Sequence, residues 1–256
     1  MKEIKILSIT KDKNKYLLKT DEDEYHLDED TIVKFYLFKD KVITEEELQE
    51  ILNYYHQNNY FNQAIRYLSY EMRSIYEVKK YLIDKGLNDV DIEVILNRLE
   101  SLGYLDDEKY AENYYDYCLR NDKGPLYIKA KLEEKKVPIH IIDKIILKYN
   151  EDIEHQTIEK LITKEARKIK TYPLIKQRQR LLTKLVQNGF NKDLIYEVIN
   201  NFQLLDESDE RLNLEYQKLL SKYQKKDLSP NEVRSKIINA LLSKGYEYQK
   251  ILGIIE

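Results

Sequence analysis

The residues best placed to do chemistry are three adjacent carboxylates, Asp106, Asp107 and Glu108. Neighbouring carboxylates can hold a divalent cation or share the roles of general acid and base. They have no His or Cys nearby, and they come directly before a stretch with helical apolar spacing. An Asp in this position is more typical of a helix N-cap, with further acids stabilised in the first turn by the helix dipole. We therefore interpret Asp106 as the cap of a helix from Asp107 and predict no metal site.

The other candidates for catalysis do not form a constellation. The chain has four histidines: His26, His56, His140 and His155. Their spacing is not that of metal ligands on one helix. Lys123-Gly124-Pro125 is a single turn rather than a phosphate-binding loop, and the serines lack a Gly-x-Ser-x-Gly context. The single cysteine, Cys118, cannot form an internal disulfide. We predict a protein that is not an enzyme and needs no cofactor.

Charge is unevenly distributed along the chain. The net charge is −3, but residues 1–59 carry nine Lys and no Arg against 14 acids, a net charge of −5. Residues 154–190 carry nine Lys and Arg against three Glu, a net charge of +6. A locally basic segment favours a partner that includes a polyanion, although a solvated helix face has a similar composition.

Candidate contacts to a partner or to DNA are the basic side chains of the predicted helices. They are Arg66, Arg73, Lys79, Lys123, Lys168, Lys170, Arg178, Arg180 and Lys184. Such residues neutralise phosphates. Tyr114, Tyr115 and Tyr117 could stack on bases, but tyrosine clusters more often pack one helix on another, which is our prediction here.

The bulk composition favours a helical protein of the cytoplasm. The 256 residues are 42% hydrophobic and 35% charged, with only 6 Gly and 4 Pro. The sequence contains no apolar run of about 18 residues, so we predict no membrane span. The N-terminal residues lack the apolar core of a signal peptide, and we expect a cytoplasmic monomer.

Residues 1–59 are predicted to form an acidic head. Short strands are expected over residues 3–28, with turns at 11–15 and 21–24. Asp30-Thr31 is expected to cap a short helix ending at Phe38. Thr44 opens a capping box with Glu47, which predicts a helix to about Tyr55.

From residue 60 onward, one helical pattern recurs four times. Ten-residue segments that start at residues 78, 128, 181 and 237 align without gaps. Each has an apolar stripe, and its fifth position is a leucine: Leu82, Leu132, Leu185 or Leu241. The ninth position is Gly86, Gly189 or Gly245, as expected where a helix ends in a left-handed residue, but Lys136 takes this place in the second copy.

A second helix follows each segment, and a helix rich in Tyr and Leu precedes it. The preceding helices are expected at 64–72, 107–119, 157–170 and 210–223. The sequence thus predicts a mostly α fold, an extended array of tandem three-helix units with a small N-terminal β-containing segment. The predicted repeats are 60–105 (repeat 1), 106–150 (repeat 2), 151–205 (repeat 3) and 206–256 (repeat 4).

Repeats 1 and 2 resemble the RecX family. The resemblance is carried by AIRYL at 64–68, RS at 73–74, KG at 85–86, LESLGYLDD at 99–107, YA at 110–111 and KGP at 123–125. Two positions depart from the family pattern. Glu71 stands where RecX sequences commonly have a basic residue, and Lys136 stands where they have Gly.

The resemblance implies a modulator of RecA in DNA repair and recombination. Such proteins lie in the groove of the RecA–single-stranded DNA filament and usually inhibit it. They lower its ATP hydrolysis, its strand exchange and its co-protease activity in the SOS response. The residues themselves leave two alternatives open: a DNA-binding helical-repeat protein that acts without RecA, and a helical scaffold that binds only protein.

Overall fold

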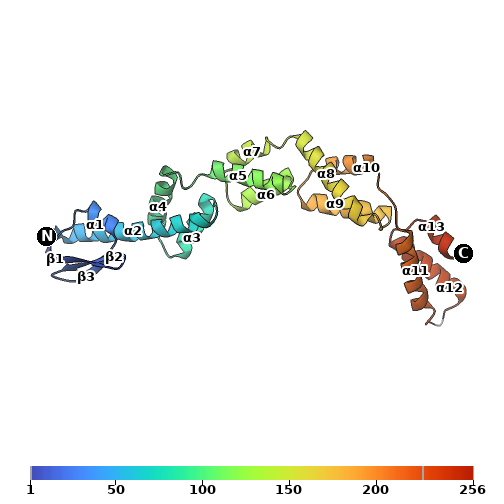
Figure 1. Ribbon diagram of the computed structural model, residues 1–256, viewed down its shortest axis with the longest axis horizontal. Helices are drawn as coiled ribbons and strands as arrows, with labels where there is room; N and C mark the ends of the chain where they lie inside the picture. Colours follow the sequence, from blue (N-terminus) through green and yellow to red (C-terminus); the bar gives the residue numbers. More distant parts are fainter. Residues whose placement is uncertain (1, 227, 256) are drawn as a thin grey trace. The chain divides into compact units, whose positions relative to one another are not determined.

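The computed structural model describes residues 2–226 and 228–255 (Figure 1). The chain has two compact parts, Met1–Tyr110 and Ala111–Glu256. The predicted mostly α fold is confirmed, because the described residues form thirteen helices and one small antiparallel sheet at the N-terminal end. Among the helices described, none has both the length and the apolar character that crossing a bilayer requires.

The sheet has the strand order β3-β2-β1-β4. Its strands are β1 (Glu3–Asp12), β2 (Lys15–Thr20), β3 (Glu24–Leu27) and β4 (Val42–Thr44). All neighbours are antiparallel, and Asp12 pairs with Lys15 across a tight hairpin turn. The first three strands were predicted. β4 was not, because three residues are too few to show the alternation of a strand.

The short helix α1 (Glu29–Lys34) begins and ends earlier than predicted. Asp28 caps it in place of Asp30, since the Asp28 carboxylate accepts a hydrogen bond from the backbone N–H of Thr31 at 2.8 Å. The sequence 28–31 contains several residues able to cap a helix, so the pattern could not fix which one does.

The long helix α2 (Glu45–Tyr70) begins at the predicted capping box of Thr44 with Glu47. It does not end near Tyr55, because no Gly or Pro interrupts residues 45–70. The predicted boundary between residues 59 and 60 therefore falls inside a helix, and the helix expected at 64–72 is the end of α2.

One helix thus serves two hydrophobic cores. The first half of α2 buries Leu48 and Ile51 against the sheet, and its second half buries Phe61 and Ala64 in the first helical core. Between them lies the buried side chain of Asn58. Its amide donates to the Asp28 carboxylate at 2.8 Å, and its oxygen accepts from Arg98 at 3.0 Å.

The helices after the sheet come in groups of three, which we number as the predicted repeats. Repeat 1 has α2, α3 (Ile75–Asp84) and α4 (Asp89–Ser101); repeat 2 has α5 (Asp107–Arg120), α6 (Pro125–Glu134) and α7 (Ile139–Ile146). Repeat 3 has α8 (Glu151–Ile169), α9 (Leu174–Gln187) and α10 (Lys192–Asn201); repeat 4 has α11 (Asp209–Tyr223), α12 (Pro230–Ser243) and α13 (Tyr248–Ile255).

The predicted register of the four copies is confirmed. Leu82, Leu132, Leu185 and Leu241 are each at most 1% exposed. The three glycines of the ninth position have φ of +86°, +83° and +89°, so each helix ends in a left-handed residue. Lys136 adopts the same conformation with φ of +55°, which is unfavourable for a residue with a Cβ.

Repeats 2 and 3 meet through two glycines. The N–H of Gly124 donates to the carbonyl of Asn188 at 2.8 Å, and the N–H of Leu126 donates to the carbonyl of Gly189 at 3.0 Å. A Cβ on Gly124 would lie 2.4 Å from the Gly189 oxygen, and a Cβ on Gly189 would lie 2.2 Å from the nitrogen of Tyr127. We call this contact the glycine joint.

Truncating the buried leucines should destabilise the protein. Each of the substitutions Leu82→Ala, Leu132→Ala, Leu185→Ala and Leu241→Ala should lower the free energy of unfolding by about 2–5 kcal/mol, because each leaves a cavity in a core. Urea unfolding followed by circular dichroism measures the loss. Leu147, which is 83% exposed, is the control, and Leu147→Ala should change stability by less than about 0.5 kcal/mol.

The glycine joint can be tested against a glycine of equal backbone conformation. Gly86→Ala should cost about 1 kcal/mol, because the left-handed backbone penalises a Cβ and open space surrounds the site. Gly189→Ala should cost at least about 2 kcal/mol more, because its Cβ also collides with Tyr127. Equal losses in urea unfolding would show that the joint adds nothing to stability.

Candidate functional site

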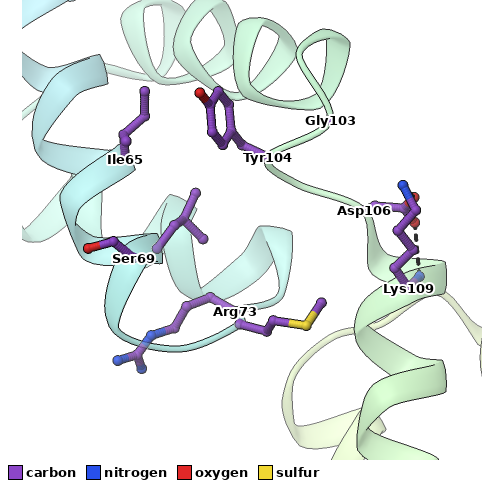
Figure 2. A pocket seen from close by; sticks show the side chains of 9 residues that line it. Ile65, Ser69, Arg73, Gly103, Tyr104, Asp106 and Lys109 are labelled. Atoms are coloured by element: carbon purple, nitrogen blue, oxygen red, sulfur yellow. Dashed lines mark hydrogen bonds and ion pairs between the residues drawn. The ribbon is translucent and has the colours of Figure 1, made fainter.

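Of the candidate residues of repeat 1, Arg73 lines a cleft of about 280 Å³. The cleft is formed between the end of α2 and the turn from α4 to α5, and Arg73, Tyr104 and Lys109 are among its lining residues (Figure 2). Arg66 is exposed on α2, outside this lining. Lys79 forms an ion pair with Glu93 at 2.8 Å.

Arg73 is held by contacts within repeat 1. Its guanidinium carbon lies 4.3 Å from the ring centre of Tyr67, which is stacked on Tyr81 with ring centres 4.3 Å apart. The same guanidinium pairs with Glu71 at 2.5 Å and approaches Glu77 at 3.9 Å. Glu71 is the departure from the family pattern noted in the sequence. Here it balances the charge of Arg73.

Two of the three carboxylates at 106–108 accept hydrogen bonds from backbone N–H groups at the start of a helix. The Asp106 carboxylate accepts from the backbone N–H of Lys109 at 3.0 Å, and this bond lowers the pKa of Asp106. The predicted cap is thus confirmed. Asp107 is buried and accepts from the backbone N–H of Ile75, the first residue of α3, at 2.9 Å, while Ser74 is the N-cap of that helix. Burial raises the pKa of Asp107, and the bond from Ile75 opposes that effect. Among the described residues, no three or more His, Cys, Asp or Glu side chains are grouped so that they could hold a metal ion.

The candidates in repeat 2 differ in their surroundings. The Lys123 ammonium donates to the side chain of Asn188 at 2.9 Å, beside the glycine joint. The predicted packing role is confirmed for Tyr115, which is buried and meets Tyr149 edge to face with ring centres 6.2 Å apart. It is wrong for Tyr117, which is 53% exposed. Tyr114 is half-buried, and burial raises its pKa.

The five candidate cations of repeat 3 fall into two groups. Three are paired with acids: Lys168 and Lys184 with Glu165 at 2.8 and 2.7 Å, and Lys170 with Glu207 at 2.6 Å. The two lysines lower the pKa of Glu165, which keeps it ionised. The two arginines have neutral partners. Arg178 donates to the side chain of Asn200 at 2.9 Å, and Arg180 stacks on Tyr172 with its guanidinium carbon 3.9 Å from the ring centre.

Of the residues that gather around Tyr172, the sequence singled out only Arg180. Arg211 of α11 also stacks on this ring at 3.8 Å, and Lys176 and Lys244 line the same cleft of about 420 Å³. We call this the Tyr172 cleft. Lys176 was within reach of the sequence argument, because it lies one helical turn before Arg180. Arg211 and Lys244 were not, because repeat 4 has no excess of positive charge to mark them.

Fold and surface together define a helical-repeat protein that presents clustered cations on its third and fourth repeats. Comparison with known proteins identifies its family. The family model described as "RecX, first three-helix domain" matches residues 61–99. The chain is 32% identical to the regulatory protein RecX of Streptococcus agalactiae serotype V over 253 residues, which cover 97% of each chain. It is 30% identical to the regulatory protein RecX of Staphylococcus haemolyticus, over 91% of this chain and 88% of that one.

Solved structures of RecX proteins have the same fold as this chain. A crystal structure of regulatory protein RecX superposes with a TM-score of 0.65 at 25% identity, covering 78% of this chain and all of the other. RecX from Lactobacillus salivarius superposes with a TM-score of 0.52 at 27% identity, over 57% and 95% of the two chains. The chain belongs to the RecX family of regulatory proteins.

The hydrogen bond between Asp107 and the start of α3 gives a stability prediction. Asp107→Ala leaves the backbone N–H of Ile75 without its acceptor and should lower the free energy of unfolding by about 1–2 kcal/mol. Asp107→Asn keeps an acceptor oxygen and should retain most of the stability at pH 7 in urea unfolding.

The pH dependence of these variants provides the control. Because the folded-state pKa of Asp107 is raised, its ionised form is disfavoured in the fold, and stability is lost as pH rises through that pKa. The stability of Asp107→Asn relative to that of the parent protein should therefore increase as pH rises. An Asn variant as unstable as the Ala variant at every pH would show that the hydrogen bond to Ile75 does not stabilise the fold.

Proposed function

We propose that this protein is a non-catalytic inhibitor of RecA that binds the RecA–single-stranded DNA filament. By occupying the filament it would limit ATP hydrolysis, strand exchange and co-protease activity, and so restrain recombination, DNA repair and the SOS response. The observation that carries the proposal is membership in the RecX family along nearly the whole chain. We propose that it acts in the cytoplasm as a monomer, without a cofactor.

We propose that the contact includes the basic surface of repeat 3. Arg178 and Arg180 are exposed on α9, and neither forms an ion pair among the described residues. Lys168 and Lys170 lie on α8 and at its end, in exposed ion pairs that a stronger anion could displace at small cost. Cations on such a surface speed encounter with a polyanion and release counterions from it. If several repeats contacted the filament at once, the overall affinity would exceed that of any single repeat.

The cations of the Tyr172 cleft also favour the second candidate, a DNA-binding protein that acts without RecA. The two candidates differ in whether binding to single-stranded DNA changes when RecA is added. A scaffold that binds only protein would show little dependence of its affinity on salt. The direct test is the ATPase rate of RecA on single-stranded DNA with and without this protein.

Charge reversal tests the contact surface. Changing Lys168, Lys170, Arg178 and Arg180 together to Glu should weaken inhibition of the RecA ATPase, most clearly at moderate salt, because attraction to phosphate becomes repulsion. Thermal stability should change little, because the four side chains make only surface ion pairs, one hydrogen bond and one stack.

The matched control reverses four exposed lysines of the acidic head, Lys11, Lys13, Lys15 and Lys39, and should inhibit like the parent. If the repeat 3 variant inhibited RecA as well as the parent at every salt concentration, the contact would lie elsewhere. If the parent had no effect on RecA, the proposed function itself would be wrong.

A further inference from the structure

Tyr172, in the loop between α8 and α9, lies between two guanidinium groups. The guanidinium carbon of Arg180 is 3.9 Å from its ring centre, and that of Arg211 is 3.8 Å away. Two guanidinium groups cannot both lie within 4 Å of one ring centre on the same face without colliding. They therefore take opposite faces of the ring, and both faces of Tyr172 are covered.

The stacking arranges the two arginines for binding an anion. A guanidinium that lies flat on an aromatic ring keeps its N–H groups in its own plane, directed to the side of the ring. This orientation limits the freedom of a long side chain before a ligand arrives, and two parallel N–H groups match two oxygens of a phosphate. Tyr172 thus supports two anion-binding groups that come from different repeats.

The charge of the surrounding cleft is strongly positive. Four of its lining residues are cations, Lys176, Arg180, Arg211 and Lys244, and one is an acid, Glu215. Glu215 is paired with Lys244 at 2.5 Å, and this contact lowers the pKa of its carboxyl. The other three cations have no carboxylate within ion-pair distance among the described residues.

The positive surface continues along α9. Lys176, Arg180 and Lys184 are spaced at four-residue intervals, so they lie on one face of the helix and recur about every 6 Å. Lys184 shares Glu165 with Lys168, so Lys176 and Arg180 are the members of this row without an acidic partner. A second cleft, of about 580 Å³, is lined by the three residues of this row and by polar side chains that include Gln179 and Thr183. The two clefts share Lys176 and Arg180. Regularly spaced cations suit a chain of regularly spaced anions better than a single carboxylate.

We propose that the Tyr172 cleft binds the sugar–phosphate backbone of a nucleic-acid strand, with Arg180 and Arg211 on the phosphates and Lys176 on a neighbouring one. Bases cannot stack on Tyr172, because both of its faces are covered, and Tyr246 is buried. The contact is therefore to phosphate and does not distinguish bases. This inference deepens the proposed function by naming the nucleic-acid contact of the basic surface, and it rests on that function for the source of the strand.

The test measures binding of the full-length protein to a fluorescent dT oligonucleotide, without RecA, by anisotropy over a series of salt concentrations. Arg180→Ala combined with Arg211→Ala should weaken binding at least about tenfold. It should also reduce the slope of log affinity against log salt by about 1.4, since each phosphate contact contributes about 0.7 on a single strand. Lys176→Ala, which leaves the stack intact, should reduce the slope by about 0.7.

The matched control removes two exposed lysines outside the cleft, Lys192 and Lys225, by substitution with Ala, and should leave the slope within about 0.3 of the parent. Oligonucleotides of dA and dT should bind the parent equally. The proposal fails if the control lowers the slope as much as the double arginine variant does. It also fails if a poly-glutamate peptide of equal charge competes as well as the oligonucleotide, which would indicate an acidic protein partner.

A RecA ATPase assay run in parallel separates this inference from the proposed function. If the parent inhibits RecA but the cleft variants bind the oligonucleotide like the parent, the cleft assignment is wrong and the function stands. If the cleft variants lose oligonucleotide binding as expected but the parent leaves RecA unaffected, the function is wrong and the cleft assignment stands.

Discussion

The arrangement of the C-terminal part depends on the backbone contact between Gly124 and Gly189. The N–H groups at the start of α6 meet the carbonyl groups at the end of α9, so opposite ends of two helix dipoles face each other and satisfy each other's unpaired backbone groups. A Cβ on either glycine would overlap the other chain segment. With its end fixed here and Leu181 and Leu185 turned to the core, α9 must direct its row of Lys176, Arg180 and Lys184 outward.

Two buried amide side chains connect elements that lie far apart in the sequence. In repeat 3 the side chain of Gln177 is fully buried. Its amide nitrogen donates to the carbonyls of Tyr172 and Leu205 at 2.7 Å each. One side chain therefore ties the loop that carries Tyr172 to the segment that leads into α11, and this brings Arg211 to the ring. Asn58 has the same role between the sheet and the first helical core. A polar group buried with defined partners allows fewer alternative arrangements than an apolar contact does, because any shift leaves it unsatisfied.

Most of the fold could be predicted from the sequence, because each repeat is marked by a pattern of residues close together in the chain. Leucine spacing and a glycine at each helix end depend only on residues a few positions apart, and the structure follows them closely. What could not be predicted depends on distant contacts or on very short elements. The strand β4 has too few residues to show a pattern, and α2 continues past Tyr55 because its second half packs in a different core. Glu71 is one of two departures from the family pattern, and its pairing with Arg73 could not be derived from spacing alone.

The candidate site was predicted less well, because a count of charges along a segment does not say which charges remain available. Residues 154–190 carry an excess of six positive charges, yet Glu165 and Glu207 take up three of the named lysines. The cations that lack an acidic partner come together only when repeat 4 adds Arg211 to the ring that Arg180 already covers. An ion pair at the surface contributes little to stability, so pairing of this kind serves mainly to cancel charge. The field that a partner meets is therefore set by the cations left unpaired. One group of such cations lies at Tyr172, where aromatic stacking rather than an opposite charge holds Arg180 and Arg211 in place.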